Sequence, residues 1–290
     1  MDVKPLRENR LHGNPGFPVG FYRIERTAGE SILDNHWHEE IEFLMVTYGK
    51  AIFQIGLASY ELKAGEAIFI PGGELHGGFP LEEAPCTYEA VVCDLGWLIG
   101  SGDQMAKRYL LPLQRGLLSL PSHWTADAEW GPKLLTQLRT VLDLEASDDP
   151  ARELRVKIGL LALFADLISR GLMQSKHPGE PSERRAAERL KNVLLFIEAH
   201  FARRLTVREL ADVAGMSEGH FSRVFRTYMR QTPIAYLNRY RIRHAAGRLL
   251  DSDLTISEAA LESGFDNFSY FIKLFRAVYG CTPKAYRNRP

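Results

Sequence analysis

The chain has 290 residues, enough for two domains, and its hydrophobic content of 45% and charged content of 25% are typical of a globular protein. Its zero net charge is divided unevenly, because residues 183–290 hold 19 Lys and Arg against 11 Asp and Glu, whereas residues 1–182 hold 17 against 25. The basic part, at +8, suits the phosphates of a nucleic acid, and the acidic part, at −8, is excluded from that role.

Residues 17–95 have the pattern of a β domain. Short segments rich in β-branched and aromatic residues alternate there with Gly, Pro and Asn, at a spacing that predicts antiparallel hairpins closing into a barrel or sandwich. Residues 102–120 are mixed and predict no single element. The predicted strands are Val19–Ile24, Glu42–Tyr48, Ala51–Ile55, Ala67–Ile70 and Tyr88–Val92.

Three histidines and a glutamate form a pattern within this β domain. His36 and His38 would point to the same face of a strand, and Glu42 and His76 complete a set of three imidazoles and a carboxylate, which suits Fe, Mn, Ni or Zn. The spacing resembles the two cupin motifs, which implies a cupin-like barrel; in metal-dependent cupins these positions are the ligands. The motif residues are His36, His38, Glu42 and Gly49, then Gly65, Pro71, Gly73 and His76.

Three interpretations of this cluster stay open from the sequence. The side chains would line a pocket for a small-molecule effector, with Trp37 stacking on a sugar ring or packing in the core. Alternatively, they would bind a divalent transition-metal ion, or only cap strands at the barrel mouth. The effector-binding candidates are His36, Trp37, His38, Glu42 and His76, and the metal candidates are His36, His38, Glu42 and His76.

Helical periodicity replaces the strand pattern over Pro132–Glu145 and Ala151–Met173. Apolar residues alternately four and three apart in the second segment predict one apolar seam. The seam would pack on the barrel or form a dimer surface, and we favour a homodimer because symmetric dimers are common and often bind operators. The seam comprises Leu154, Ile158, Leu161, Ala165, Ile168 and Leu172, widened by Leu160, Phe164 and Leu167.

A linker is predicted at residues 175–182, where two prolines, a glycine and polar residues cannot continue a helix. Helical pattern resumes at about residue 183. The predicted organisation is therefore an effector-binding and dimerisation domain at residues 1–174, the linker, and a DNA-binding domain at residues 183–290.

The last third of the chain contains an internal repeat. Leu205–Ala211 and Gly215 recur 49 residues later as Leu254–Ala260 and Gly264, which indicates two copies of one supersecondary unit. Each copy predicts a short capped helix, a left-handed turn at Gly and a second helix. This is a helix-turn-helix, whose second helix enters the major groove of DNA. The capping pairs are Thr206 with Glu209 and Thr255 with Glu258.

The second helix of each unit is predicted to be amphipathic. A spacing of four residues puts Phe221 with Phe225, and Phe271 with Phe275, on the buried face. Outward Arg and Lys can reach guanine acceptors, and outward Ile or Phe can contact thymine methyls. A merely solvated face is disfavoured, because the repeat and the charge segregation agree. The predicted DNA-binding residues are Glu218, Gly219, His220, Ser222, Arg223 and Arg226, and then Asn267, Phe268, Ser269, Ile272, Lys273 and Arg276.

One long helix is predicted between the two units, over Pro233–Leu250. At 1.5 Å per residue it would span about 27 Å. That length suits two recognition helices in successive major grooves, about 34 Å apart. The helix carries Arg239, Arg241, Arg243 and Arg248.

Residues from about 190 to 287 resemble the C-terminal domain of the AraC/XylS family of bacterial transcription regulators. The matching residues are Arg241-Ile242, Ala245, Leu249-Leu250, Ile256, Glu258-Ala259-Ala260, Gly264-Phe265, Ser269-Tyr270-Phe271, Gly280, Thr282-Pro283 and Tyr286-Arg287. The resemblance implies that both units bind a double-stranded DNA operator. The implied base contacts are Gly219, Ser222 and Arg223 in the first unit and Phe268, Ser269, Ile272 and Lys273 in the second.

Two residues depart from the family pattern. Gly219 has no side chain where a base contact is implied, and Arg230 stands where the pattern and the second repeat, at Gly280, have glycine. A non-glycine residue in the left-handed conformation costs about 1–2 kcal/mol. We hypothesise that Arg230 is strained and compensates through a phosphate contact.

Cysteine usage and hydropathy favour a cytoplasmic protein without a membrane partner. Cys86, Cys93 and Cys281 form no C-x-x-C pair, which argues against a disulfide framework or a zinc finger. No apolar run approaches the about 20 residues of a membrane span. The N-terminus lacks the apolar core of a signal peptide.

The leading hypothesis is a one-component regulator of α+β class, with an N-terminal cupin-like β-barrel, dimerisation helices and a C-terminal all-α domain with two helix-turn-helix motifs. An effector would shift a pre-existing equilibrium between two dimer arrangements. Family likeness implies a carbohydrate effector and activation through RNA polymerase. The alternatives are a metal-dependent cupin enzyme, an oxygenase or isomerase, fused to a DNA-binding domain, and constitutive DNA binding with a vestigial barrel. We favour a non-enzyme, because no nucleophile–base pair or phosphate-binding glycine loop is found elsewhere.

Overall fold

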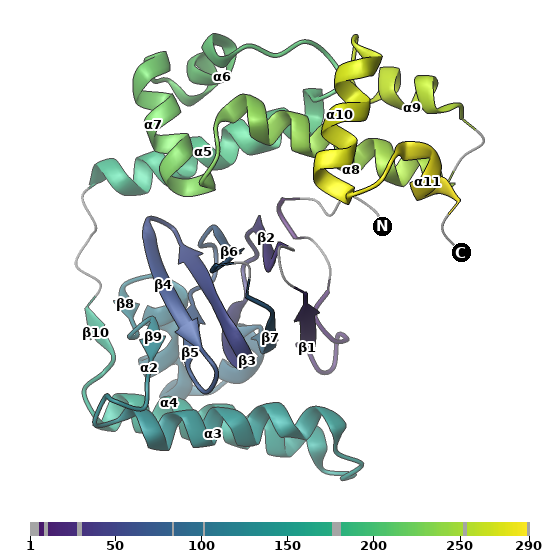
Figure 1. Ribbon diagram of the computed structural model, residues 1–290. Helices are drawn as coiled ribbons and strands as arrows, with labels where there is room; N and C mark the ends of the chain where they lie inside the picture. The colour runs from purple at the N-terminus through teal and green to yellow at the C-terminus, as the bar shows by residue number, and fades with distance from the viewer. Residues whose placement is uncertain are drawn as a thin grey trace. The chain divides into compact units, whose positions relative to one another are not determined.

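The computed structural model describes residues 6–8, 11–27, 31–82, 84–100, 102–175, 181–251 and 254–288. The chain divides into two compact units, one of residues 8–179 and one of residues 180–290 together with residues 1–7. The first is rich in strands and the second is helical (Figure 1). The division falls within the predicted linker at residues 175–182, of which residues 176–180 lie outside the described residues. The described ends of that segment differ from the prediction, because Ser175 ends a short strand and the next helix begins at Pro181 instead of at about residue 183, since proline is tolerated in the first turn of a helix.

The strand-rich unit is built on one antiparallel sheet. Its main path runs β1 (Val19–Arg26), β7 (Cys86–Cys93), β3 (Ile41–Ile55), β5 (Ala67–Ile70) and β9 (His123–Trp124). β4 (Ala58–Lys63) and β6 (His76–Pro80) also pair with β3, and β2 (Leu33–His36) pairs with β6. A separate pair joins β8 (Leu118–Ser119) to β10 (Gln174–Ser175). The predicted antiparallel β domain is confirmed.

The long strand β3 corrects one prediction. Glu42–Tyr48 and Ala51–Ile55 were expected as two strands, but they form one strand of 15 residues. Gly49 bends it with φ of +74°, and a Cβ there would lie 1.9 Å from the carbonyl oxygen of Pro85. Glycine therefore redirects the strand instead of ending it. The first half of β3 pairs with β5 and β7, and the second half pairs with β4 and β6.

Side-chain alternation along β3 separates two cores. Phe43 and Met45 face one layer, which includes the buried side chains of the helices packed on the sheet. Leu44 and Val46 face the other layer, inside the barrel, where aliphatic and aromatic side chains fill the space. Glu42 has the parity of Leu44, which carries its carboxylate to the inner side. The sheet thereby places a buried charge at the end of an apolar interior.

Helices cover one side of this sheet, and α3 and α4 lie along it side by side (Figure 1). The segment that predicted no element contains α2, whose internal Pro112 disguises the helical pattern. The helices are α1 (Leu95–Ile99), α2 (Gln104–Gln114), α3 (Gly131–Asp143), the 3-10 turn η1 (Leu144–Ala146) and α4 (Arg152–Ser169).

The predicted seam on α4 is divided between the core and solvent, because Leu161 and Leu172 pack against the core. The buried face is Val156, Leu160, Leu163, Phe164 and Leu167. Leu154 and Ile158, by contrast, are 60% and 56% exposed. The residues that widen the seam pack on the barrel, while the two N-terminal members of the seam itself remain available to a partner.

The second unit is helical throughout, as predicted. Its elements are α5 (Pro181–His200), α6 (Val207–Ala214), α7 (Glu218–Met229), α8 (Pro233–Asp251), α9 (Ile256–Glu262), α10 (Phe268–Tyr279) and α11 (Pro283–Arg287). α6 with α7 and α9 with α10 are the two helix-turn-helix pairs. In the described ranges, no helix combines the length and the apolar character needed to cross a bilayer.

The predicted N-terminal caps and the predicted glycine turn are present in these helix pairs. The hydroxyl of Thr206 accepts a hydrogen bond from the amide of Glu209 at 3.2 Å, and Thr255 does the same for Glu258. Glu258 also accepts from the amide of Thr255 at 2.7 Å, which completes the capping box. Gly215 ends α6 in the left-handed conformation, with φ of 59°.

Arg230 ends α7 in the left-handed conformation, with φ of 52° and ψ of 19°. Arg230→Gly should therefore raise the melting temperature by a few degrees, since relieving about 1–2 kcal/mol of strain exceeds the entropic cost of glycine. The matched substitution Gly280→Arg should lower the melting temperature, because φ is +68° there. Nothing lies within 4 Å of an added Cβ, so the loss would come from backbone strain and not from a steric clash. Thermal unfolding of both variants checks the pair.

The same variant tests the phosphate hypothesis. Arg230→Gly should reduce the salt dependence of operator binding by about one unit of slope. An unchanged slope would exclude a phosphate contact by Arg230. A fall in melting temperature would show that the contacts of its side chain outweigh the backbone strain.

Candidate DNA-binding surface and histidine cluster

The recognition helix of the first unit, α7, presents the predicted polar face to solvent. Phe221 and Phe225 are buried, as their spacing predicts. A Cβ at Gly219 would meet nothing within 4 Å, so internal packing does not impose glycine there. Glu218, Gly219, His220, Arg223 and Arg226 are exposed, and Ser222 is half-buried.

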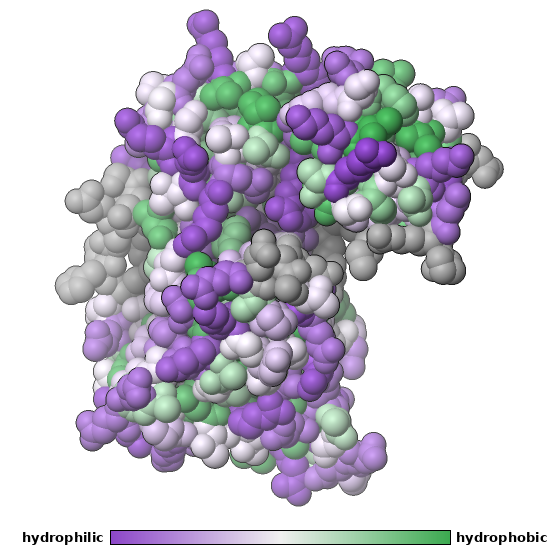
Figure 2. Space-filling view, in the orientation of Figure 1, coloured by the Kyte–Doolittle hydropathy of each residue, from purple (hydrophilic) through white to green (hydrophobic). Residues whose placement is uncertain are grey.

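The second recognition helix, α10, has a more apolar outer face. Phe268 is 42% exposed at its first turn, whereas Ile272 is half-buried against the domain core. Asn267 caps the helix, because its side-chain oxygen accepts the amide of Tyr270 at 2.9 Å. Asn267, Phe268, Ser269, Lys273 and Arg276 are exposed. Figure 2 shows apolar surface interrupting polar surface in the region of α9 and α10.

One arginine of the connecting helix has a structural role that spacing alone does not reveal. Arg241 on α8 donates to the carbonyl oxygens of Phe201 and Arg203, both at 2.8 Å. A Cβ at Gly264 would lie 2.7 Å from the carbonyl oxygen of Ala202, so the turn of the second unit packs directly on the loop before α6. These contacts connect α8 and the turn of the second helix-turn-helix pair to the loop that precedes the first pair.

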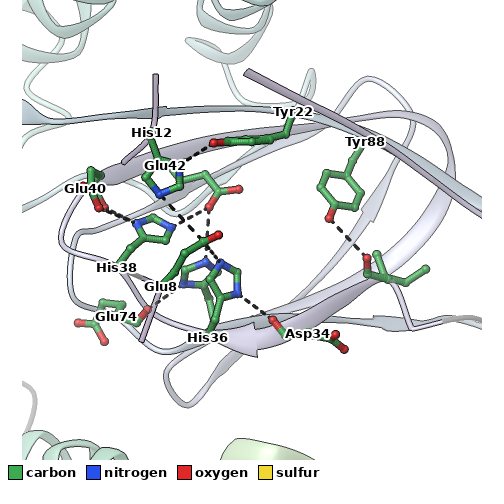
Figure 3. A network of polar contacts seen from close by, with 12 residues as sticks. Glu8, His12, Tyr22, Asp34, His36, His38, Glu40, Glu42, Glu74 and Tyr88 are labelled. Atoms are coloured by element: carbon green, nitrogen blue, oxygen red, sulfur yellow. Dashed lines mark hydrogen bonds and ion pairs between the residues drawn. The ribbon is translucent and has the colours of Figure 1, made fainter. Parts of the chain in front are cut away.

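The four predicted metal candidates do meet. His36, His38, Glu42 and His76 each offer one ligand atom, and these atoms all lie within 4.8 Å of one another. His38 Nε2 and His76 Nε2 lie 3.3 and 3.4 Å from the same oxygen, Glu42 Oε2. Figure 3 shows His36, His38 and Glu42 pointing toward one another. His36 ends β2, Glu42 follows the start of β3 and His76 begins β6, whereas His38 lies between β2 and β3 and not, as its spacing predicted, on one strand with His36. His38, Glu42 and His76 are buried.

Each imidazole is held through its other nitrogen. The Nδ1 atoms of His36 and His76 lie 2.8 Å from the carbonyl oxygens of Asp34 and Glu74. His38 Nδ1 lies 3.1 Å from the carbonyl oxygen of Glu40. A carbonyl oxygen only accepts, so each Nδ1 carries the proton. The Nε2 atoms are therefore the ones turned toward the centre of the cluster.

Burial and partners set the protonation of the cluster. Burial raises the pKa of Glu42, but its interactions with His38 and His76 outweigh burial and hold that pKa well below its usual range. Burial lowers the pKa of His38, but the hydrogen bond and charge of Glu42 raise it above its ordinary value. Burial, followed by the charge of His36, lowers the pKa of His76 to about 4. At neutral pH a charged carboxylate thus faces a neutral His76.

Residues before the barrel join this cluster and were not predicted. Glu8 Oε2 lies 3.3 Å from His36 Nε2, and the His12 ring lies 5.2 Å from the His38 ring. His12 Nδ1 also meets the hydroxyl of Tyr22 at 2.8 Å. No regular spacing connects these residues to the motif, so only the folded chain reveals them. Trp37 is buried and outside the ligand group.

Comparisons with known proteins agree with both units. Residues 210–289 match the family model of a helix-turn-helix domain, and residues 18–127 match that of an AraC-like ligand binding domain. The chain is 25% identical over 287 residues to YdeC of Bacillus subtilis (strain 168), named an uncharacterized HTH-type transcriptional regulator, covering 98% of this chain and 96% of that protein. It is also 25% identical over 286 residues to the HTH-type transcriptional activator RhaS of Escherichia coli (strain SMS-3-5 / SECEC), covering 96% of each.

A solved structure, the DNA-binding domain of the transcriptional factor AdpA in complex with a target DNA, is 32% identical to this chain. The match covers 34% of this chain and 88% of the AdpA chain, with a TM-score of 0.33. The two family matches account for the two units seen in the structure, a ligand-binding domain and a helix-turn-helix domain. The chain belongs to the AraC family of transcription regulators, with a ligand-binding domain and a DNA-binding domain on one polypeptide.

Proposed function

We propose that the protein is a one-component regulator whose α7 and α10 enter successive major grooves of one operator. The proposal is supported by the exposed face of each helix, which carries the cationic side chain of Arg223 on α7 and of Lys273 on α10, opposite a buried pair of phenylalanines. α8 has 19 residues, which span about 28 Å. A rigid connection of that length suits grooves about 34 Å apart.

The DNA captured from fragmented genomic DNA by the purified full-length protein tests this proposal. The wild-type protein should enrich fragments that share one bipartite motif. A variant carrying both Arg223→Ala and Lys273→Ala should enrich no shared motif, because both recognition helices lose a cationic side chain. Enrichment of the same motif by this variant would contradict the assignment of α7 and α10.

The regulator acts as a homodimer in this proposal. Leu154 and Ile158 expose more than half of their surface on α4, although both are large and apolar. They are four residues apart, so they lie on the same face of the helix, as adjacent members of a coiled-coil seam do. A second copy of the same helix would cover such a seam with twofold symmetry.

Ile158→Glu should shift the protein from dimer to monomer, because a charge at the centre of an apolar seam is left without a partner. Sedimentation velocity checks the mass. Thr136→Glu is the control, since it adds the same charge at an exposed position of the neighbouring helix α3. A dimer that survives Ile158→Glu at every concentration tested would place the interface elsewhere.

Transcription activation through RNA polymerase is part of the proposal, supported by the likeness to a relative named as an activator. The carbohydrate class of the effector stays a prediction from the sequence. The effector binds to the ligand-binding domain in this proposal, which is supported by the match of residues 18–127 to an AraC-like ligand binding domain.

A further inference from the structure

The cluster at His36, His38, Glu42 and His76 leaves one buried ring nitrogen without a hydrogen bond. His76 Nε2 is buried and makes no hydrogen bond, although Glu42 Oε2 lies 3.4 Å away. Its Nδ1–H donates a hydrogen bond to the carbonyl oxygen of Glu74. In that tautomer a nitrogen lone pair faces a carboxylate oxygen, and neither atom can donate to the other.

A cation between these side chains would satisfy the unpaired nitrogen and the carboxylate together. An unpaired buried polar atom destabilises the fold, and a buried carboxylate without a counter-charge destabilises it more. The ring centroids of His36 and His76 lie 4.2 Å apart, so the positive charges of two protonated rings would repel each other. A divalent ion at the centre would instead satisfy all four ligand atoms together.

The outer hydrogen bonds are those of a metal site. Histidine ligands in metalloproteins usually donate their second ring nitrogen to a backbone carbonyl or a carboxylate, which fixes the tautomer and the ring orientation. All three histidines do so here, through the carbonyl oxygens of Asp34, Glu40 and Glu74. The Nε2 atoms of the three rings are thus oriented toward the cluster before any ion binds.

The donor set also selects the class of ion. Three imidazole nitrogens and one carboxylate oxygen favour first-row transition ions over Mg²⁺ and Ca²⁺, which prefer all-oxygen shells. No cysteine belongs to the candidate ligand groups among the described residues, which disfavours Cu(I). Mn²⁺, Fe²⁺, Co²⁺, Ni²⁺ and Zn²⁺ remain.

We propose that the ligand-binding domain of this regulator binds one divalent first-row transition-metal ion through His36, His38, Glu42 and His76, with Glu8 as an adjacent carboxylate. Glu8 Oε2 is 3.3 Å from His36 Nε2, so the ion would lie within reach of its carboxylate. The metal site would add a bound ion to the domain proposed to bind the effector. Metal binding itself does not depend on the proposed function, but any effect of the ion on regulation does.

Metal retention by the full-length, tag-free protein tests the proposal. Chelator-treated protein is mixed with Mn²⁺, Fe²⁺ under anaerobic conditions, Co²⁺, Ni²⁺ or Zn²⁺, desalted, and analysed by mass spectrometry of the elements. At least one of these ions should be retained at one per chain and should raise the melting temperature. Co²⁺ should give visible absorption bands of nitrogen coordination.

Variants assign the ligands. His76→Gln and Glu42→Gln keep side chains that are polar and of similar size. Loss of a residue that only hydrogen-bonds to a metal ligand weakens metal affinity by about 10–100-fold, so loss of a ligand itself should weaken it by more. Glu8→Gln should weaken it less. His123→Gln is the matched control, because His123 faces Glu66 at 3.3 Å in the same domain but outside the ligand group.

The outcomes separate this proposal from the regulator function. Failure to retain any of the five ions at stoichiometry, with an unchanged melting temperature, would overturn the metal site. Equal retention by wild type and both ligand variants would overturn it as well. Operator binding is measured on the same metal-free samples, so intact DNA binding without metal retention would leave the regulator function standing.

Discussion

Replacing Phe275 by Ala should lower the free energy of unfolding of the DNA-binding domain by about 3–5 kcal/mol. The side chain is fully buried on α10, and the centroid of its ring lies 5.6 Å from that of Phe271 and 5.4 Å from that of Tyr286. Its removal leaves a cavity among aromatic rings that cannot collapse without moving the helix. Domains of this size have about 5–15 kcal/mol of stability, so operator binding should fall with folding. Urea unfolding measures the loss.

The same helix provides the control. Phe268→Ala removes the same side chain from the exposed face, where the residue is 42% exposed, and should change stability by less than about 1 kcal/mol. Operator affinity should still fall, because the ring is available to thymine methyls. If Phe268→Ala destabilised the domain as much as Phe275→Ala, the inner and outer faces of α10 would be wrongly assigned.

Arg223→Ala should weaken binding to the operator by about 5–150-fold, which corresponds to about 1–3 kcal/mol for one good base contact. Arg223 is exposed on α7, opposite the buried pair Phe221 and Phe225, and its guanidinium can donate two hydrogen bonds to one guanine. The loss should be larger for the operator than for random DNA. Fluorescence anisotropy with both duplexes measures the ratio.

Arg223→Lys distinguishes a base contact from a phosphate contact. Lysine keeps the charge and loses the bidentate geometry, so specificity should fall while the salt dependence stays close to that of the wild type. Arg185→Ala, on the exposed surface of α5, is the control for lost charge outside the recognition helices. A uniform loss on all sequences in Arg223→Lys would contradict a base contact.

The helical domain was largely predictable because its determinants are local. The cap at Thr206, the turn at Gly215 and the pair Phe221 with Phe225 each act within one or two helical turns, and the repeat shows them twice. The role of Arg241 was not predictable. Its partners, the carbonyl oxygens of Phe201 and Arg203, carry no side-chain signal.

The strand domain was less predictable, since its pairing is long-range. β6 contains two glycines and ends in proline, a composition poor in strand formers, and was missed. The histidine motif did bring together its four residues, as its spacing predicted. Glu8 and His12 join them from a segment without periodicity, and only the folded chain places them there.

Hydroxyl-radical footprinting of the full-length protein on its captured operator tests the central claim most directly. Each chain should protect two segments about one helical turn, or 10 base pairs, apart, since α7 and α10 occupy successive major grooves. Phe268→Ala should weaken protection of one segment and Arg223→Ala that of the other. A single protected segment per chain, or two segments that respond alike to both variants, would contradict the account.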